Sequence, residues 1–105
     1  MQNLIDSLKQ IHGVRNVELR TLTCGFTVTF AFSDIEHTQL LFEIIQAFLD
    51  NDFRCNLDYS KQDGLHKQIS LCYVFNDKYI GGFTVSTPKM EPSDTGDFRL
   101  ELRTK

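Results

Sequence analysis

Hydrophobic and polar positions recur along the chain with two different periods, and each change of period marks a boundary between predicted elements. From Leu4 to Ile11 the apolar residues follow helical spacing, and Gly13 then interrupts the pattern. Glycine adopts the left-handed conformation that closes many helices at little cost. The pattern therefore predicts a first helix over about residues 2–12.

A second helical pattern follows Ser33 and ends near Asn51. Ser33 and Glu36 have the spacing of a capping box, in which a hydroxyl and a carboxylate satisfy backbone amides at the start of a helix. The sequence therefore predicts that this helix opens at Ser33. Its apolar surface is wide, which predicts a helix laid deeply on a sheet. The residues of this surface are Ile35, Leu40, Leu41, Phe42, Ile44, Ile45, Phe48 and Leu49.

The remaining segments alternate with the period of two that is typical of half-buried strands. The strongest stripe runs from Phe26 to Phe32 and follows a predicted turn at residues 23–25. Further alternation predicts that Leu57 and Tyr59 share one face of their strand. The predicted strands cover residues 14–22, 26–32, 53–59, 69–75, 79–86 and 98–103, and residues 60–67 are predicted as a loop.

The resulting order is helix, two strands, helix, four strands, within a single domain over residues 1–105. No connection is long enough to hold a further helix, and short links between successive strands favour antiparallel pairing. We therefore expect an α+β domain, in which a twisted antiparallel sheet of about five to six strands carries both helices on one face.

Composition narrows the functional classes. The 105 residues contain 14 acidic and 11 basic side chains, which gives a net charge of −3 and a pI of about 5.5. Nucleic-acid-binding proteins usually carry a basic face, because Lys and Arg contacts with phosphates supply much of their affinity. The charge balance therefore argues against direct nucleic-acid binding and favours a basic protein partner.

The three cysteines predict a reducing compartment, because their number is odd, their spacing is wide and no CxxC pair occurs. Cys55 and Cys72 fall on apolar stripes and are expected in the core, whereas Cys24 falls in a turn. No signal peptide, membrane span or lipidation signal is apparent in the sequence. A cytoplasmic protein with no membrane partner is the prediction.

Gly81 and Gly82 raise the question of a ligand that approaches the backbone. They interrupt a predicted strand, where a bulge or a bend is the usual explanation. A phosphate-binding loop would instead place its glycines between a strand and a helix. His and Cys residues lack metal-ligand spacing, and no nucleophile, base and orienting group form a motif. We therefore expect no catalytic, cofactor or metal site.

We expect a non-enzymatic protein-binding module, most specifically a small inhibitor of the immunity-protein type that neutralises a basic, nuclease-like toxin. Carboxylates on loops would cover the cationic cleft of the partner, and a tyrosine would anchor the contact. The predicted partner-binding residues are Asp58, Tyr59, Asp63, Tyr79, Glu91, Asp94 and Asp97.

Two alternatives remain open. The first is a domain that binds a small ligand, or catalyses a reaction, in a pocket between sheet and helices with His37 or Tyr73 pointing inward. The second is a structural homo-oligomeric subunit, in which the last strand, residues 98–103, pairs edge to edge with a second copy. The sequence is compatible with a monomer and with a homodimer.

Overall fold

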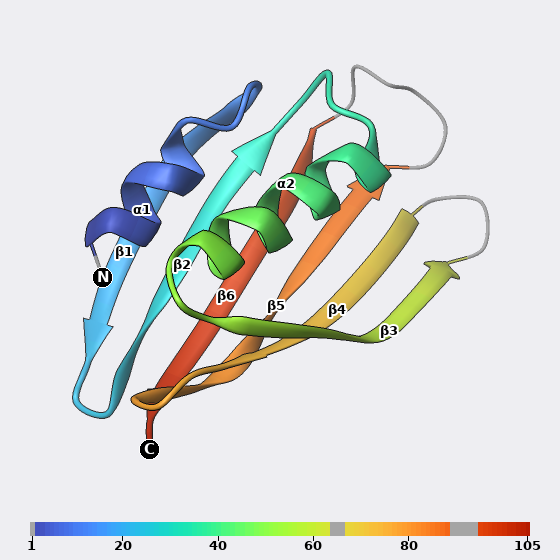
Figure 1. The fold of residues 1–105 in the computed structure, drawn as a ribbon. Coiled ribbons are helices and arrows are strands. Elements are labelled where there is room, and N and C mark those ends of the chain that lie inside the picture. Colours follow the sequence, from blue (N-terminus) through green and yellow to red (C-terminus); the bar gives the residue numbers. More distant parts are fainter. Residues whose placement is uncertain (1, 64–66, 89–94) are drawn as a thin grey trace.

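Six strands form one twisted antiparallel sheet, and both helices lie on the same face of it (Figure 1). The computed structural model describes residues 2–63, 67–88 and 95–105. The elements in chain order are α1 (Gln2–Lys9), β1 (Val14–Leu22), β2 (Gly25–Phe32), α2 (His37–Asp50), β3 (Arg54–Asp63), β4 (Lys67–Phe75), β5 (Tyr79–Pro88) and β6 (Gly96–Thr104). The predicted element order and the α+β class are confirmed. Within the described ranges, no helix is long and apolar enough to cross a membrane.

The strands follow the order β1-β2-β6-β5-β4-β3 across the sheet. β3 to β6 form a meander, and β6 enters between β5 and β2, so that the last strand is central. The prediction that residues 98–103 pair edge to edge with a second copy is therefore wrong, because neighbouring strands occupy both edges of β6. The free edges of the described sheet belong to β1 and β3.

The core lies between the helices and the face of the sheet that they cover, which we call the inner face. The alternation from Phe26 to Phe32 is confirmed, because every second side chain of β2 is buried. β6 follows the same pattern, and the ring of Phe30 stacks on that of Phe98 with centroids 4.4 Å apart. From α2, Phe48 stacks on Phe83 of β5 at 5.3 Å. Aromatic packing thus fixes α2 against the centre of the sheet.

The start of α2 differs from the prediction. The helix begins at His37, its cap residue is Glu36, and no side chain in the described part of the chain makes a capping hydrogen bond. The Ser33 hydroxyl is used elsewhere, because it accepts a hydrogen bond of 3.2 Å from the Arg15 guanidinium. Asp34 follows with a φ of 61°, which takes the backbone out of the helical region. The predicted capping box is therefore wrong.

β3 contains an irregularity that reverses the facing of Tyr59. Leu57 pairs with Cys72, whereas Tyr59 pairs with Leu71, so that Asp58 is an extra residue without a partner on β4. An extra residue moves all later side chains to the opposite face. Tyr59 therefore faces away from the helices and does not share a face with Leu57. β3 also continues to Asp63, through residues that were predicted as a loop.

Gly81 and Gly82 lie in an uninterrupted part of β5, because the strand keeps its register with β4 and with β6. A Cβ atom on Gly81 would overlap the carbonyl oxygen of Glu101, and one on Gly82 would approach that of Cys72 within 2.6 Å. The glycines are therefore explained by the close approach of neighbouring strands, and the expected bulge is absent from this described segment.

Candidate functional site

The predicted partner-binding residues that the structure describes are spread over three strands of the sheet. Asp58 and Tyr59 lie on β3, whereas Asp97 lies on β6, with β4 and β5 between these strands. Tyr79 is half-buried at the start of β5, and its ring packs edge-on against Phe26 at 5.3 Å. The remaining predictions, Glu91, Asp94 and the side chain of Asp63, lie outside the described residues.

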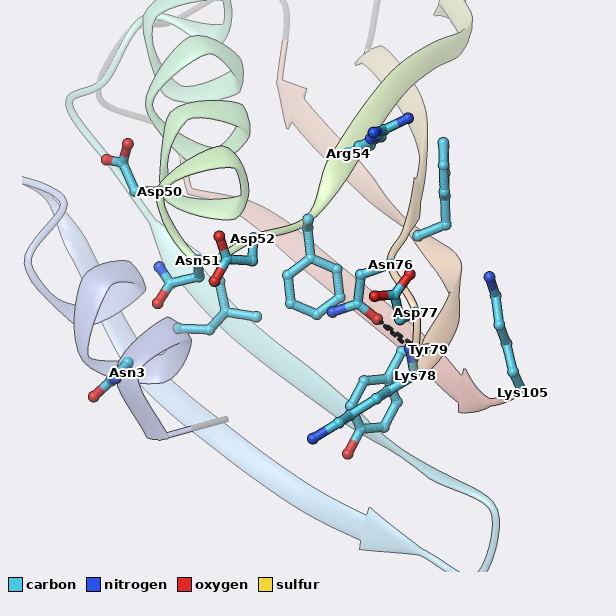
Figure 2. Close-up of a pocket in the computed structure, with 13 residues that line it drawn as sticks. Asn3, Asp50, Asn51, Asp52, Arg54, Asn76, Asp77, Lys78, Tyr79 and Lys105 are labelled. Carbon is cyan, nitrogen blue, oxygen red and sulfur yellow. Dashed lines mark hydrogen bonds between the residues drawn. The ribbon is translucent and has the colours of Figure 1, made fainter.

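An open cleft of about 790 Å³ lies at the end of the molecule where α2 finishes (Figure 2). Its walls come from the start of α1, the connection between α2 and β3, the turn between β4 and β5, and Lys105. The cleft therefore collects residues that are far apart in the sequence. We call it the α2-end cleft.

Hydrogen bonds hold the wall formed by the turn between β4 and β5. The side-chain oxygen of Asn76 accepts bonds from the backbone N–H groups of Lys78, at 2.9 Å, and Tyr79, at 2.8 Å. The backbone N–H of Lys105 donates to the carbonyl of Lys78 at 2.9 Å. An Asn side chain that closes a turn in this way restricts its backbone. The turn falls at residues 76–78, between the strands predicted over residues 69–75 and 79–86, and this wall is preorganised.

Aromatic rings connect the wall of the cleft to the hydrophobic core. Phe53 is buried and packs edge-on against Phe48 at 5.4 Å, and its ring centroid lies 6.5 Å from that of Tyr79. Tyr79, a predicted anchor, thus joins the core to the cleft wall.

The carboxyl end of α2 has an unfavourable local electrostatic arrangement. Asp50 lies in the last turn, Asp52 follows the cap residue Asn51, and the last turn contains no basic residue. A helix carries partial negative charge at this end, so that a carboxylate there is destabilising by roughly 0.3–1 kcal/mol. Asp52 also has a φ of 66°, a region that favours glycine. Arrangements that oppose local stability concentrate at functional sites.

The whole segment around α2 is acidic. Residues 33–52 contain five carboxylates and neither Lys nor Arg. Gln46 donates a hydrogen bond of 2.9 Å to Asp50, but the one ion pair within the described ranges joins Arg103 to Glu101 on another element. One carboxylate oxygen of Glu43 is buried without a described hydrogen-bond partner. The five acidic residues are Asp34, Glu36, Glu43, Asp50 and Asp52.

Two large apolar side chains of α2 face solvent. Phe42 is 67% exposed and Leu49 is 48% exposed, so the predicted deep burial holds for only part of this helix. The two positions are seven residues apart and therefore share one side of the helix. Asn51 donates a hydrogen bond of 3.3 Å to Ser7 of α1, which places α1 on a different side of α2. Leu57, on the inner face of β3, is also exposed.

A polar cluster is buried under the start of α2. Nε2 of His37 lies 2.8 Å from Ser70 Oγ, and Nδ1 lies 3.0 Å from Thr87 Oγ1. Burial lowers the pKa of His37, so its ring is neutral at pH 7 and each nitrogen meets a hydroxyl. Although the first distance would suit a nucleophile and its base, Ser70 is 1% exposed, and Nδ1 meets no carboxylate among the described residues. The cluster is therefore a structural tie between α2 and the sheet. Tyr73, the other inward candidate, lies on the opposite face.

The face of the sheet opposite to the helices, the helix-free face, has a different character. Among the residues whose side chains the structure describes, pairing register places six cationic and three acidic side chains on this face. Exposed apolar side chains, among them Leu71 and Tyr73, gather on β3, β4 and β5. The cations are Arg15, Arg20, Arg54, Lys61, Arg99 and Arg103, and the acids are Glu18, Asp97 and Glu101.

The set of predicted partner-binding residues omits Phe42, Asp50 and Asp52. Two signals could have identified them: residues 33–52 lack any basic side chain, and the apolar surface of α2 is wider than one buried face requires.

No protein-family model, curated protein or solved structure matches the chain. In the part of the chain that the structure describes, no three His, Cys, Asp or Glu side chains are grouped to hold a metal ion.

Proposed function

We propose that the chain is a non-enzymatic binding module for a basic protein, and that α2 and the α2-end cleft make the contact. In its most specific form the module is a cytoplasmic inhibitor that masks a cationic enzyme, as an immunity protein masks a nuclease-like toxin. One observation carries the proposal. Asp50 and Asp52 stand at the negative end of α2, beside an open cleft, in a segment without a single Lys or Arg.

A basic side chain of the partner would find three favourable groups at this position. The carboxylates of Asp50 and Asp52 would form charge-assisted hydrogen bonds with it. The carboxyl end of the α2 dipole also attracts positive charge, and Tyr79 lines the cleft beside these groups. A bound cation would also offset the unfavourable interaction between the carboxylates and the helix dipole. This gain would add to the free energy of binding.

The cleft also constrains how such a partner approaches. Arg54, Lys78 and Lys105 line it as well, and Figure 2 shows Arg54 and Lys105 apart from Asp50 and Asp52. Positive charge of the partner would be repelled on that side. We therefore expect the basic side chain to enter on the side of Asp50 and Asp52.

Apolar contact area would come from the exposed side of α2. Aromatic residues supply much of the binding free energy in protein interfaces, and charged groups around them improve specificity and association rate. Phe42 is the described large hydrophobic residue with the highest exposure, and Leu49 continues the same side toward the cleft. The proposed interface thus consists of Phe42, Leu49, Asp50 and Asp52.

The test compares three full-length baits at low salt: the wild-type chain, the D50N/D52N variant, and an L71S/Y73S variant changed on the helix-free face. A protein captured from lysate of the encoding organism is purified, and its affinity for each bait is measured by calorimetry. We expect a basic partner that binds D50N/D52N at least about tenfold more weakly than wild type, which corresponds to about 1.4 kcal/mol. Added salt should weaken the wild-type complex.

Loss of affinity in L71S/Y73S alone would move the interface to the helix-free face and contradict the proposal. The inhibitor form has its own measurement, because an enzymatic partner should lose activity when an equimolar amount of wild-type chain is added. If an enzymatic partner binds through α2 and stays fully active, the chain is a binding module but not an inhibitor.

A further inference from the structure

Two of the three cysteines are neighbours in the sheet. Cys55 on β3 pairs with Val74, and Cys72 on β4 pairs with Leu57, so the cysteines occupy diagonal positions on the inner face. Sγ of Cys72 lies 3.3 Å from the carbonyl oxygen of Asn56, which directs the thiol toward β3. The two thiol groups are therefore aimed at the same space between adjacent strands.

The two thiols also affect each other's ionisation. A hydrogen bond with Cys72, together with burial, raises the pKa of Cys55, and the same bond lowers the pKa of Cys72. The Cys55 thiol thus stabilises a thiolate on Cys72, and the thiolate is the reactive form of cysteine.

The two thiols differ in solvent accessibility. Cys72 is fully buried, whereas Cys55 is half-buried on β3, an edge strand with no neighbour on its outer side in the described sheet. Cys24 is exposed in the turn between β1 and β2, near the opposite edge. A small oxidant can reach Cys55, and Cys24 is too far across the sheet to take part.

We propose that Cys55 and Cys72 form a reversible disulfide between β3 and β4 in response to hydrogen peroxide. The coupled pair shares one proton, and Cys55 first passes it to the Cys72 thiolate, so that Cys55 Sγ can attack the peroxide. The products are a sulfenic acid on Cys55 and a hydroxide, which takes the proton back from Cys72 and becomes the first water molecule. The Cys72 thiolate then attacks Cys55 Sγ, the sulfur–sulfur bond forms, and the hydroxide that leaves takes up a proton to become a second water. Two electrons pass from the thiols to the peroxide, so atoms and charge balance.

The bond requires a small movement of β3. Diagonal neighbours on antiparallel strands have Cα atoms roughly 7–8 Å apart. A disulfide needs about 4.4–6.8 Å. β3 is the strand that can shift, because it is paired on one side only and is already irregular at Asp58. Strain from this movement makes the disulfide easier to reduce than an unstrained one, which suits a reversible modification.

The test uses the full chain with the C24S substitution, which leaves two thiols of the three. After peroxide treatment, free thiols are counted in denaturant, and the alkylated chain is digested without reduction for mass spectrometry. We expect loss of both thiols, a monomeric chain lighter by two hydrogen atoms, a linked peptide pair containing Cys55 and Cys72, and recovery of both thiols with dithiothreitol. A sulfinic or sulfonic acid on Cys55 beside a free Cys72 would overturn the proposal.

Two controls keep the result specific. A C24S/C55S variant should resist peroxide, because its remaining thiol is buried, and loss of that thiol at the same rate would contradict the order of steps. The C24S chain oxidised in urea provides the second control, since disulfide formation that is as fast in urea as in buffer would show that the native strands do not bring the thiols together. Neither control depends on a binding partner, so this proposal and the proposed function can fail separately.

Discussion

The same six strands build two faces that differ in packing and in charge. The inner face is apolar. The segment that contains α2, which covers this face, carries carboxylates and has neither Lys nor Arg from residue 33 to residue 52. The described side chains of the helix-free face include six cations and three acids, together with exposed apolar residues. The net charge of −3 therefore describes neither of these two surfaces. A partner must be inferred for one face at a time.

The largest expected effect contrasts a buried and an exposed leucine. Leu100 is fully buried on the inner face of β6, whereas Leu71 on the helix-free face of β4 is 36% exposed. We expect Leu100→Ala to lower the free energy of unfolding by about 2–5 kcal/mol, because it leaves a cavity. Leu71→Ala should change it by about 0.5 kcal/mol. Urea unfolding measures both, and equal losses would mean that the helix-free face is covered in solution.

The second-largest expected effect concerns the close contacts between neighbouring strands within the sheet. Gly81→Ala should lower stability by about 1–3 kcal/mol, because the new Cβ would overlap the Glu101 carbonyl oxygen. Thr84→Ala, on the same strand, adds no atom and should cost less than about 1 kcal/mol. Thermal unfolding followed by circular dichroism compares the two variants. An unchanged Gly81→Ala protein would show that the strands can separate locally without loss.

The third prediction concerns pH and the polar cluster beneath α2. Burial lowers the pKa of His37 below the usual 6.5, so the unfolded chain binds the proton more readily than the folded one. The stability that His37 contributes is therefore fully present above pH 6.5 and is lost as the pH falls below that value. In His37→Gln this dependence should be absent. Urea unfolding midpoints measured from pH 8 down to pH 5 check the difference, and parallel curves for both proteins would contradict it.

The smallest expected effect is a gain in stability on the helix side. Asp52→Asn keeps a side chain that tolerates a positive φ and removes a charge that opposes the helix dipole, so stability should rise by about 0.3–1 kcal/mol. Glu101→Gln on the helix-free face breaks an exposed ion pair with Arg103 and should change stability by at most about 0.5 kcal/mol. Chemical denaturation resolves the two variants. A loss of stability in Asp52→Asn would mean that this carboxylate is already stabilised within the isolated chain.

Sequence patterns predicted the elements correctly where the structure depends on residues close together in the chain. Strict alternation from Phe26 to Phe32 required one buried face, and the structure confirms it. The capping box at Ser33 failed because Arg15, eighteen positions earlier, takes the hydroxyl. The facing of Tyr59 failed because a single extra residue, Asp58, has no signature in the alternation itself. The central place of β6 depends on long-range pairing that no local pattern encodes.

The candidate site was less predictable than the fold. The sequence identified an excess of acid, but Asp58 and Asp97 lie on strands separated by two others. Asp50 and Asp52 become candidate binding residues because they lie at the end of α2 beside the cleft. Their position there depends on where the helix ends and on which segments pack against that end. Exposure of Phe42 likewise depends on how far the helix sinks into the sheet, which its apolar pattern does not specify.

The central place of β6 has a consequence for biosynthesis. A ribosome releases β1, β2 and the strands β3 to β5 before β6, so the nascent chain holds two incomplete pieces of sheet whose facing edges are unpaired. Unpaired strand edges are templates for association with other chains. Assembly is completed only when β6 enters between β2 and β5 and joins segments that are distant in the sequence, a step that is expected to be slow. Mutations that weaken β6 should therefore reduce soluble yield in cells before they reduce the stability of the protein that has already folded.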